Sequence, residues 1–322
     1  MRLPEQLVRL GHLVGTEVDN VRAPGRAKLE SAYVIRPQSS DLILEVWRDL
    51  VAERADRPPI VSCHDQSVSV KIAFSTLACP AWSLRQVVEA AREYGYDGVE
   101  LRLVDGELID ARMSRAQCDR VRETFAAGEV PIVGVDTSIN VAADEPAKAV
   151  GQLKAFVELA CEWQSPIVRV FGGEGDAAHA RHVLGEAATV AETLGVTLAR
   201  ETHDHFSSSA RVAEVLDGLP PAVAALWDIA HPYRIGESCQ AVLAALHGRI
   251  AHVHVKDARP DGVPTLLGEG DVPVKSCVEA LLKTGYLGWL SVEWEKRWHP
   301  ELAEPEVALP QFATILRSWK LD

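Results

Sequence analysis

From Lys71 onward, short apolar runs alternate with longer amphipathic stretches. The apolar runs have strand length and are rich in Val, Ile and Leu, which is typical of strands buried on both faces. These apolar runs predict eight β-strands, at 71–76, 98–102, 131–137, 166–173, 196–203, 224–231, 250–257 and 289–295.

The stretches between these strands carry apolar residues at helical spacing. The clearest face follows i, i+3, i+4, i+7 behind a capping Ser83 and consists of Leu84, Val87, Val88 and Ala91. Helices are predicted at 83–94, 114–127, 146–163, 177–194, 208–217, 238–247, 274–284 and 305–319. Gly95, Gly195 and Gly285 each follow a helix, where the left-handed conformation favours glycine.

Eight strand–helix units over about 250 residues predict an α/β fold that closes as a (β/α)8 TIM barrel at 69–322. The alternative, an open doubly wound sheet, has little support. Its glycine-rich G-x-G-x-x-G turn is missing after the first strand, where the sequence is STLACPAW.

Residues 1–68 do not share this rhythm. An apolar face over 41–55 behind Ser39-Ser40-Asp41 predicts a helix, and Arg57-Pro58-Pro59 breaks the pattern. We interpret this segment as a mainly helical N-terminal extension. The alternative is a partly disordered extension.

The composition limits the classes of molecule that the protein is expected to bind. The formal charge of −13 argues against broad binding to nucleic acid or an anionic membrane, and no apolar run approaches the length of a membrane span. The six cysteines are dispersed without a C-x-x-C pair, so we expect buried free thiols in a reducing, cytoplasmic compartment. A homo-oligomer is compatible with this composition.

The run Ala251–Asp257, AHVHVKD, is unusual because one strand face carries His252, His254 and Lys256 while the other carries valines. A buried strand with three nitrogen side chains on one face indicates a chemical site. In a barrel, such a site lies at the C-terminal strand ends, and ionisable residues stand near all but the first of these ends.

Four of these residues come from strands that are neighbours around the ring: Glu201, Asp228, His254 and Glu293. Three carboxylates and one imidazole make a hard, oxygen-rich donor set that suits Mn²⁺, Mg²⁺ or Co²⁺, and that Zn²⁺ also accepts. The alternative is a set of separate ion pairs at the rim. Three inward carboxylates would repel one another without a cation, which favours a site for one divalent metal ion.

The sequence also resembles the xylose isomerase-like barrel superfamily of sugar isomerases and epimerases. The resemblance covers 71–320 and rests on FSTLACPAWSLRQVVEAAREYGYDGVELR, DIAH, HVHVKD, LGEGDVP and SVEWE. It implies that the same four residues hold the metal, that Glu201 and Glu293 transfer the proton, and that His231 contacts substrate or a bound water. Spacing alone does not rank these glutamates above the histidines as the base.

Five further ionisable residues near the strand ends are candidate substrate contacts. They are His203, Lys256, Arg169, Glu100 and Arg102, in addition to His231. Glu100 and Arg102 are alternatively a pair across the second strand, and Arg169 is alternatively the counterion of Glu100. His252 is expected to be a satisfied core histidine, and the Gly- and Pro-rich segment 258–272 is a candidate lid.

Together these observations predict a metal-dependent sugar isomerase or epimerase that moves a proton beside a carbonyl through an enediolate. A dehydratase acting on a keto-polyol or cyclitol is the main alternative. A DNA-repair endonuclease is less favoured, because 258–272 offers no histidine for additional metals. A non-catalytic binding barrel is the remaining alternative.

Overall fold

The computed structural model describes residues 70–319. Its eight barrel strands are all parallel and close in the order β1-β12-β9-β8-β7-β6-β5-β2. They are β1 (Lys71–Ser75), β2 (Gly98–Leu101), β5 (Ile132–Asn140), β6 (Ile167–Phe171), β7 (Thr197–Glu201), β8 (Val223–Asp228), β9 (Ile250–Val255) and β12 (Trp289–Val292). The predicted α/β barrel is therefore confirmed, whereas the predicted N-terminal extension at 1–68 lies outside the described residues.

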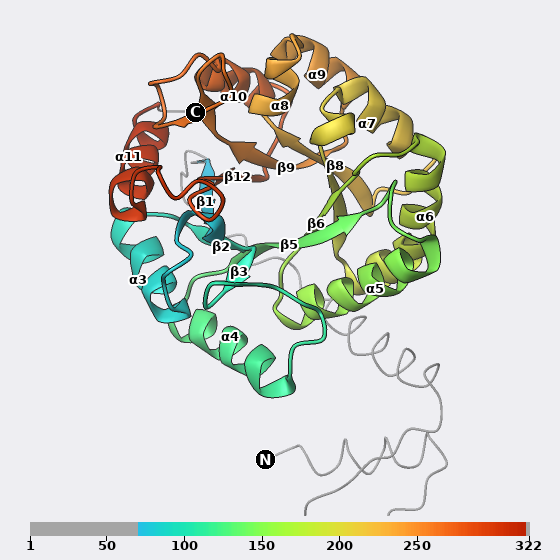
Figure 1. Ribbon diagram of the computed structural model, residues 1–322, viewed down its shortest axis with the longest axis horizontal. Coiled ribbons are helices and arrows are strands. Elements are labelled where there is room, and N and C mark those ends of the chain that lie inside the picture. The colour runs from blue at the N-terminus through green and yellow to red at the C-terminus, as the bar shows by residue number, and fades with distance from the viewer. Residues whose placement is uncertain (1–69, 320–322) are drawn as a thin grey trace, which may run out of the picture. The chain divides into compact units, whose positions relative to one another are not determined.

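Helices follow the strands in chain order and form a ring around the barrel (Figure 1). They are α3 (Leu84–Tyr94), α4 (Arg115–Ala127), α5 (Pro146–Glu162), α6 (Ala177–Leu194), α7 (Ser209–Leu216), α8 (Ala230–Arg234), α9 (Cys239–Ala245), α10 (Val274–Leu282) and α11 (Pro305–Ser318). Two short hairpins extend the loops after β2 and β9: β3 (Leu103–Val104) with β4 (Glu107–Leu108), and β10 (Asp257–Ala258) with β11 (Pro264–Thr265).

Local signals fix the helix ends as predicted. Ser83 and Gln86 form a reciprocal capping box at the start of α3, which satisfies backbone groups that the first turn leaves free. Gly95 and Gly195 end α3 and α6 in the left-handed conformation, with φ of 77° and 66°.

The end of β8 differs from the prediction. The apolar run 224–231 predicts a strand to His231, but the strand ends at Asp228 and α8 begins at Ala230. The Asp228 carboxylate accepts hydrogen bonds from the backbone N–H groups of Ala230 (2.8 Å) and His231 (3.3 Å). This turn, built by an aspartate on its own backbone, starts the helix.

Two apolar layers are separate from each other. The large one lies between the strands and the helices, and a small one consists of Ile167, Ala199 and Leu226. Residues two positions further along a strand share its face, so Arg169, Glu201 and Asp228 stand above this small layer inside the barrel. The interior is thus apolar at its base and ionisable towards the C-terminal strand ends.

The structure corrects the prediction for two cysteines. Cys239 on α9 and Cys277 on α10 form a disulfide, although the dispersed pattern indicated free thiols. The spacing of the cysteines along the sequence does not indicate this pair, because the two helices meet only in the folded barrel. Cys79 and Cys118 are free and buried, as predicted. Because the reducing compartment was predicted from free cysteines, cytoplasmic localisation stays a prediction.

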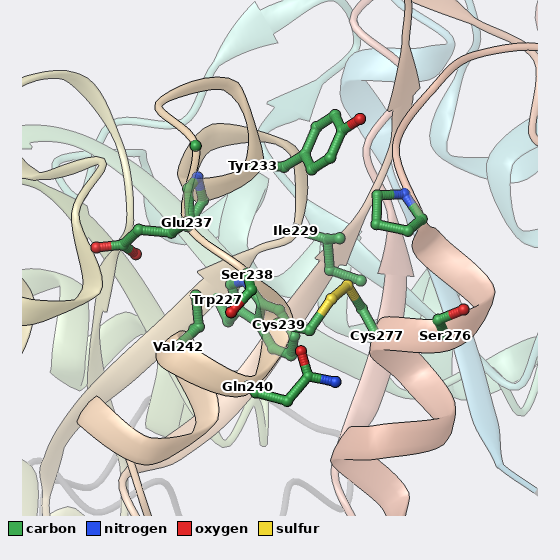
Figure 2. A pocket seen from close by; sticks show the side chains of 13 residues that line it. Trp227, Ile229, Tyr233, Glu237, Ser238, Cys239, Gln240, Val242, Ser276 and Cys277 are labelled. Atoms are coloured by element: carbon green, nitrogen blue, oxygen red, sulfur yellow. A yellow bond between two sulfur atoms is a disulfide. The ribbon is translucent and has the colours of Figure 1, made fainter.

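The disulfide lines a cavity of about 370 Å³ beside β8 (Figure 2). Trp227, Ile229 and Tyr233 supply much of its apolar wall. Trp227 and Asp228 are consecutive on one strand and therefore point to opposite faces. This cavity consequently lies outside the barrel and is separate from the acidic residues within it.

None of the helices within 70–319 combines the length and the apolar character that a membrane span requires.

Candidate metal centre and active site

Glu201, Asp228, His254 and Glu293 converge at the C-terminal end of the barrel. Asp228 pairs with His254 in the register of β8 and β9, and the backbone N–H of Glu293 donates to Val255 at the end of β9. One ligand atom from each of the four residues lies within 4.8 Å of the other three. We call these four residues the acidic cluster. All are buried, with at most 4% of any residue exposed.

The acidic cluster fits a divalent cation. Three of its buried carboxylate oxygens, Glu201 Oε2, Asp228 Oδ2 and Glu293 Oε2, accept no hydrogen bond. Buried anionic oxygens need a nearby cation, which Arg169 and Lys256 provide in this structure and which a divalent ion among the same oxygens would also provide. Asp228 is well placed for this, because its other oxygen caps α8 while Oδ2 faces the cluster. Their role as metal ligands remains a prediction.

His254 presents its two ring nitrogens to different partners. Nδ1 lies 3.3 Å from Glu201 Oε1 and 3.3 Å from Glu293 Oε2, whereas Nε2 lies 3.0 Å from Glu100 Oε1. The ring therefore separates the acidic cluster from a fourth carboxylate deeper in the barrel. Burial lowers the pKa of His254, but Glu100 and Glu293 outweigh it and raise this pKa well above its usual value.

Lys256 is the cation nearest the acidic cluster among the described residues. Its Nζ lies 2.9 Å from Asp228 Oδ2, 2.5 Å from Glu293 Oε2 and 3.0 Å from Glu295 Oε1. Burial opposes its charge, but these carboxylates raise the pKa of Lys256 well above its usual value. Lys256 is therefore an ammonium that faces the same oxygens as the predicted metal.

The two predicted proton-transfer glutamates are ionised. For Glu201, burial raises the pKa, but the nearby Arg169 guanidinium and His254 hold it at about 2. For Glu293, burial is outweighed by His254 and Lys256, which hold the pKa well below its usual value. Both side chains are thus anions that can accept a proton or a metal ion.

Two of the predicted substrate contacts, His203 and His231, are partly exposed, and His231 lies beside the acidic cluster. The side chains of His203 and His231 are 24% and 16% exposed, and their rings meet edge to face at 4.5 Å. Phe171 continues this wall, with its ring centroid 4.7 Å from that of His203. His231 Nε2 lies 3.7 Å from Asp228 Oδ2, and burial lowers the pKa of His231. These rings can contact a small polyhydroxylated molecule, a role that remains a prediction.

Among the described residues, neither Arg102 nor Arg169 forms a direct ion pair with Glu100, although the charge of Glu100 is among those that raise the pKa of Arg169. Arg102 donates to the Asp136 carbonyl (3.3 Å) and to Ser138 Oγ (2.8 Å), because β2 ends at Leu101 and the side chain turns towards β5. Arg169 forms its ion pairs with Asp136 (3.3 Å) and Glu201 (3.4 Å) instead of with Glu100. Both arginines are buried and held by protein groups, so their contact with substrate stays a prediction.

Sequence reasoning missed the surroundings of Glu100. This carboxylate accepts hydrogen bonds from Ser291 Oγ and faces His252 Nε2 at 3.2 Å. Ser291 stands two positions before Glu293, so strand alternation alone places it on the same inner face. His252 is buried as predicted, although only one of its two nitrogens has a partner. No pattern indicated that Glu100 would reach β9, because β2 and β9 are far apart in sequence.

The candidate lid at 258–272 is tied to the barrel by Asp257. This carboxylate accepts backbone N–H groups of Gly268 (2.8 Å), Gly270 (3.1 Å) and Val272 (3.2 Å). A side chain at Gly270 would place its Cβ 2.2 Å from Asp257 Oδ1, so glycine permits this close approach. The two ends of the loop after β9 are thereby held together.

Comparison with known proteins agrees with this barrel. The family model for a xylose isomerase-like TIM barrel matches residues 88–315. Similar curated proteins include an inosose dehydratase of Bacillus licheniformis, 30% identical over 36% of this chain and 45% of that protein, and the rhizopine catabolism protein MocC of Rhizobium meliloti, 34% identical over 41% and 46%. The chain spans about half the length of the curated relatives it matches.

Solved structures extend the likeness to nearly the whole barrel. An L-ribulose 3-epimerase matches with a TM-score of 0.64 at 18% identity, over 78% of this chain and 94% of that one. A probable 3-DHS dehydratase, AsbF, of Bacillus anthracis matches with a TM-score of 0.62 at 16% identity, over 77% and 98%. At these identities the likeness shows the fold alone. The same architecture therefore occurs in proteins described as epimerases and as dehydratases.

Proposed function

The chain belongs to the xylose isomerase-like TIM barrel family, and on that premise we propose that it is a divalent-metal-dependent enzyme that moves a proton beside a carbonyl of a sugar or polyol. The observation that carries the proposal is the acidic cluster, where one ligand atom from each of three buried carboxylates and one buried imidazole lies within 4.8 Å of the others. Three carboxylates and one imidazole gathered this closely are a donor set that suits a hard divalent cation.

Glu201, Asp228, His254 and Glu293 would hold the ion, with Mn²⁺, Mg²⁺ or Co²⁺ favoured by the oxygen-rich donors and Zn²⁺ as a further candidate. When bound, the ion supplies Lewis-acid polarisation of the substrate carbonyl, which makes the neighbouring C–H more acidic. The protein's own part is to place a base at that carbon and to exclude water around it.

Glu201 and Glu293 are the proposed base and acid. Both are buried anions, they come from β7 and from the position directly after β12, and both face Nδ1 of His254. One of them takes the proton from carbon. Delivery of a proton to the opposite face by the other glutamate, after that glutamate has taken up a proton from solvent, gives an epimer. Return of the proton to the neighbouring carbon gives an isomer. Lys256 would stabilise negative charge that develops on the substrate oxygen, while His231 and His203 contact its hydroxyl groups.

Dehydration is the second candidate, and the curated relatives favour it specifically. The inosose dehydratase of Bacillus licheniformis is named for that reaction on a cyclitol ketone. Here the same first proton abstraction is followed by loss of a hydroxyl from the neighbouring carbon. The leaving hydroxyl needs a proton, which the glutamate that took the proton from carbon can return to it.

A screen in deuterated water tests both reactions with one preparation. The protein is supplied with Mn²⁺, Co²⁺ or Mg²⁺ and offered ketoses, aldoses and inososes. Incorporation of deuterium at the carbon beside the carbonyl, without any other change in mass between substrate and product, indicates an epimerase or isomerase. A product that has lost one water indicates the dehydratase. Glu201→Gln and Glu293→Gln should each abolish turnover, and His254→Ala should mainly weaken metal binding. Activity that a chelator leaves unchanged would overturn the proposal.

A further inference from the structure

Glu100 lies beneath the acidic cluster and is fully buried on β2. It touches His254 from the side opposite Glu201 and Glu293: Glu100 Oε1 is 3.0 Å from His254 Nε2, and Oε2 is 3.2 Å from it. Within the described part of the chain, the ion pairs of Glu100 are with histidines alone, and no lysine or arginine forms one with it.

The barrel provides a defined space for this carboxylate. Gly134 stands opposite Glu100 in the register of β2 and β5, and a Cβ at Gly134 would come within 3.2 Å of Glu100 Cγ and Oε1. Ser291 Oγ donates to Oε2, and His252 Nε2 lies 3.2 Å from the same oxygen. The carboxylate is therefore fixed from three strands, which limits its freedom to turn away from His254.

The two nitrogens of a neutral imidazole have different roles. When one nitrogen binds a metal, the other carries the hydrogen and needs an acceptor, and that acceptor fixes the tautomer and the ring orientation. His254 Nδ1 faces the acidic cluster, so its Nε2–H points at Glu100.

We propose that Glu100 is a positioning residue of the metal centre. It accepts the Nε2–H of His254, holds the ring in its observed orientation and keeps the lone pair of Nδ1 directed at the ion. This role replaces the predicted contact of Glu100 with substrate, from which the His254 ring separates it. The inference rests on the proposed function, because it requires the acidic cluster to bind a metal ion.

Metal affinity provides the first test. Titration of the full chain with Co²⁺ alone, followed by visible absorption, should show Glu100→Gln binding roughly 10–100-fold more weakly than the wild type. Glu107→Gln, which changes an exposed glutamate on β4, is the matched control and should bind Co²⁺ within about threefold of the wild type. Ser291→Ala removes one of the hydrogen bonds that fix Glu100 but leaves its contact with His254, so its loss of affinity should be smaller than that of Glu100→Gln.

The wild-type protein alone provides the second test, which does not depend on the folding of any variant. In protein labelled with ¹⁵N-histidine and loaded with Zn²⁺, long-range ¹⁵N NMR should show His254 bound through Nδ1, with a protonated Nε2 whose hydrogen exchanges slowly. Wild-type protein that binds neither ion would overturn the proposed function itself. Wild-type binding through His254 Nε2, or Glu100→Gln binding within twofold of the wild type, would overturn only the role of Glu100.

Discussion

Replacement of Lys256 by methionine should destabilise the metal-free protein by about 3–5 kcal/mol, the cost of removing one partner from a buried ion pair. Methionine keeps an unbranched side chain of similar length but removes the ammonium that faces Asp228, Glu293 and Glu295. The Lys256 side chain is 8% exposed, so water cannot replace the lost charge effectively. For a domain of this size the loss corresponds to a melting temperature lower by roughly 6–20 °C.

Because the pKa of Lys256 is raised, its contribution to stability can be measured at neutral pH. The pKa of Lys256 is raised in the folded protein, so its contribution is fully present below the unfolded value and is lost only as pH rises through the folded value. At pH 7 the whole effect should therefore be visible. Lys275→Met is the matched control, because Lys275 is 55% exposed and forms a 3.8 Å helix-surface pair with Glu279. Its effect should stay within about 0.5 kcal/mol.

Added metal distinguishes the loss of the Lys256 charge from a general loss of packing. Lys256 and a divalent ion face the same carboxylate oxygens, so removal of the ammonium should tighten metal binding. Saturating Mn²⁺, at about 1,000 times its Kd, adds about 4.1 kcal/mol to the stability of a protein that binds it. At equal Mn²⁺ concentration, Lys256→Met should gain more in melting temperature than the wild type. The reasoning is refuted if metal-free Lys256→Met and Lys275→Met melt at the same temperature.

Two further predictions concern the disulfide between α9 and α10 and the loop after β9. Cys239 and Cys277 are 38 residues apart, so the double change to serine should lower the free energy of unfolding by about 4 kcal/mol in denaturant titrations against the oxidised wild type. A loss below 1 kcal/mol would contradict this. Asp257→Ala removes the acceptor of three loop N–H groups, and deuterium uptake over 264–272 should become roughly 10–100-fold faster while the barrel strands stay protected. Unchanged uptake in that segment would show that other contacts hold the loop.

Local patterns in the sequence were sufficient to predict most elements of the barrel. Apolar runs of strand length, the Ser83 cap and the glycines after α3 and α6 report on neighbouring residues only, and all of them are confirmed. The prediction was wrong where a side chain competes with the pattern. The apolar run of β8 continues past Asp228, but this carboxylate binds the next backbone N–H groups and starts α8.

The candidate site follows from the sequence in its members but not in its contacts. Alternation along β7, β8 and β9 places Glu201, Asp228 and His254 on the inner face, and the parallel strand order brings their ends together. Spacing did not indicate that Lys256 reaches into the same carboxylates. A long flexible side chain chooses among several partners, and only the folded arrangement of charges decides which it meets.

The sequence by itself determined the periodicity of this protein, because strand and helix periods depend on residues a few positions apart. It thereby determined that four ionisable residues end neighbouring strands. Barrel closure decided the rest. Glu100 and His254 are 154 residues apart and meet only because β2 and β9 enclose the same interior, and Cys239 meets Cys277 only because α9 packs against α10. Contacts of that separation have no local pattern, since loop closure and packing of the whole chain select them.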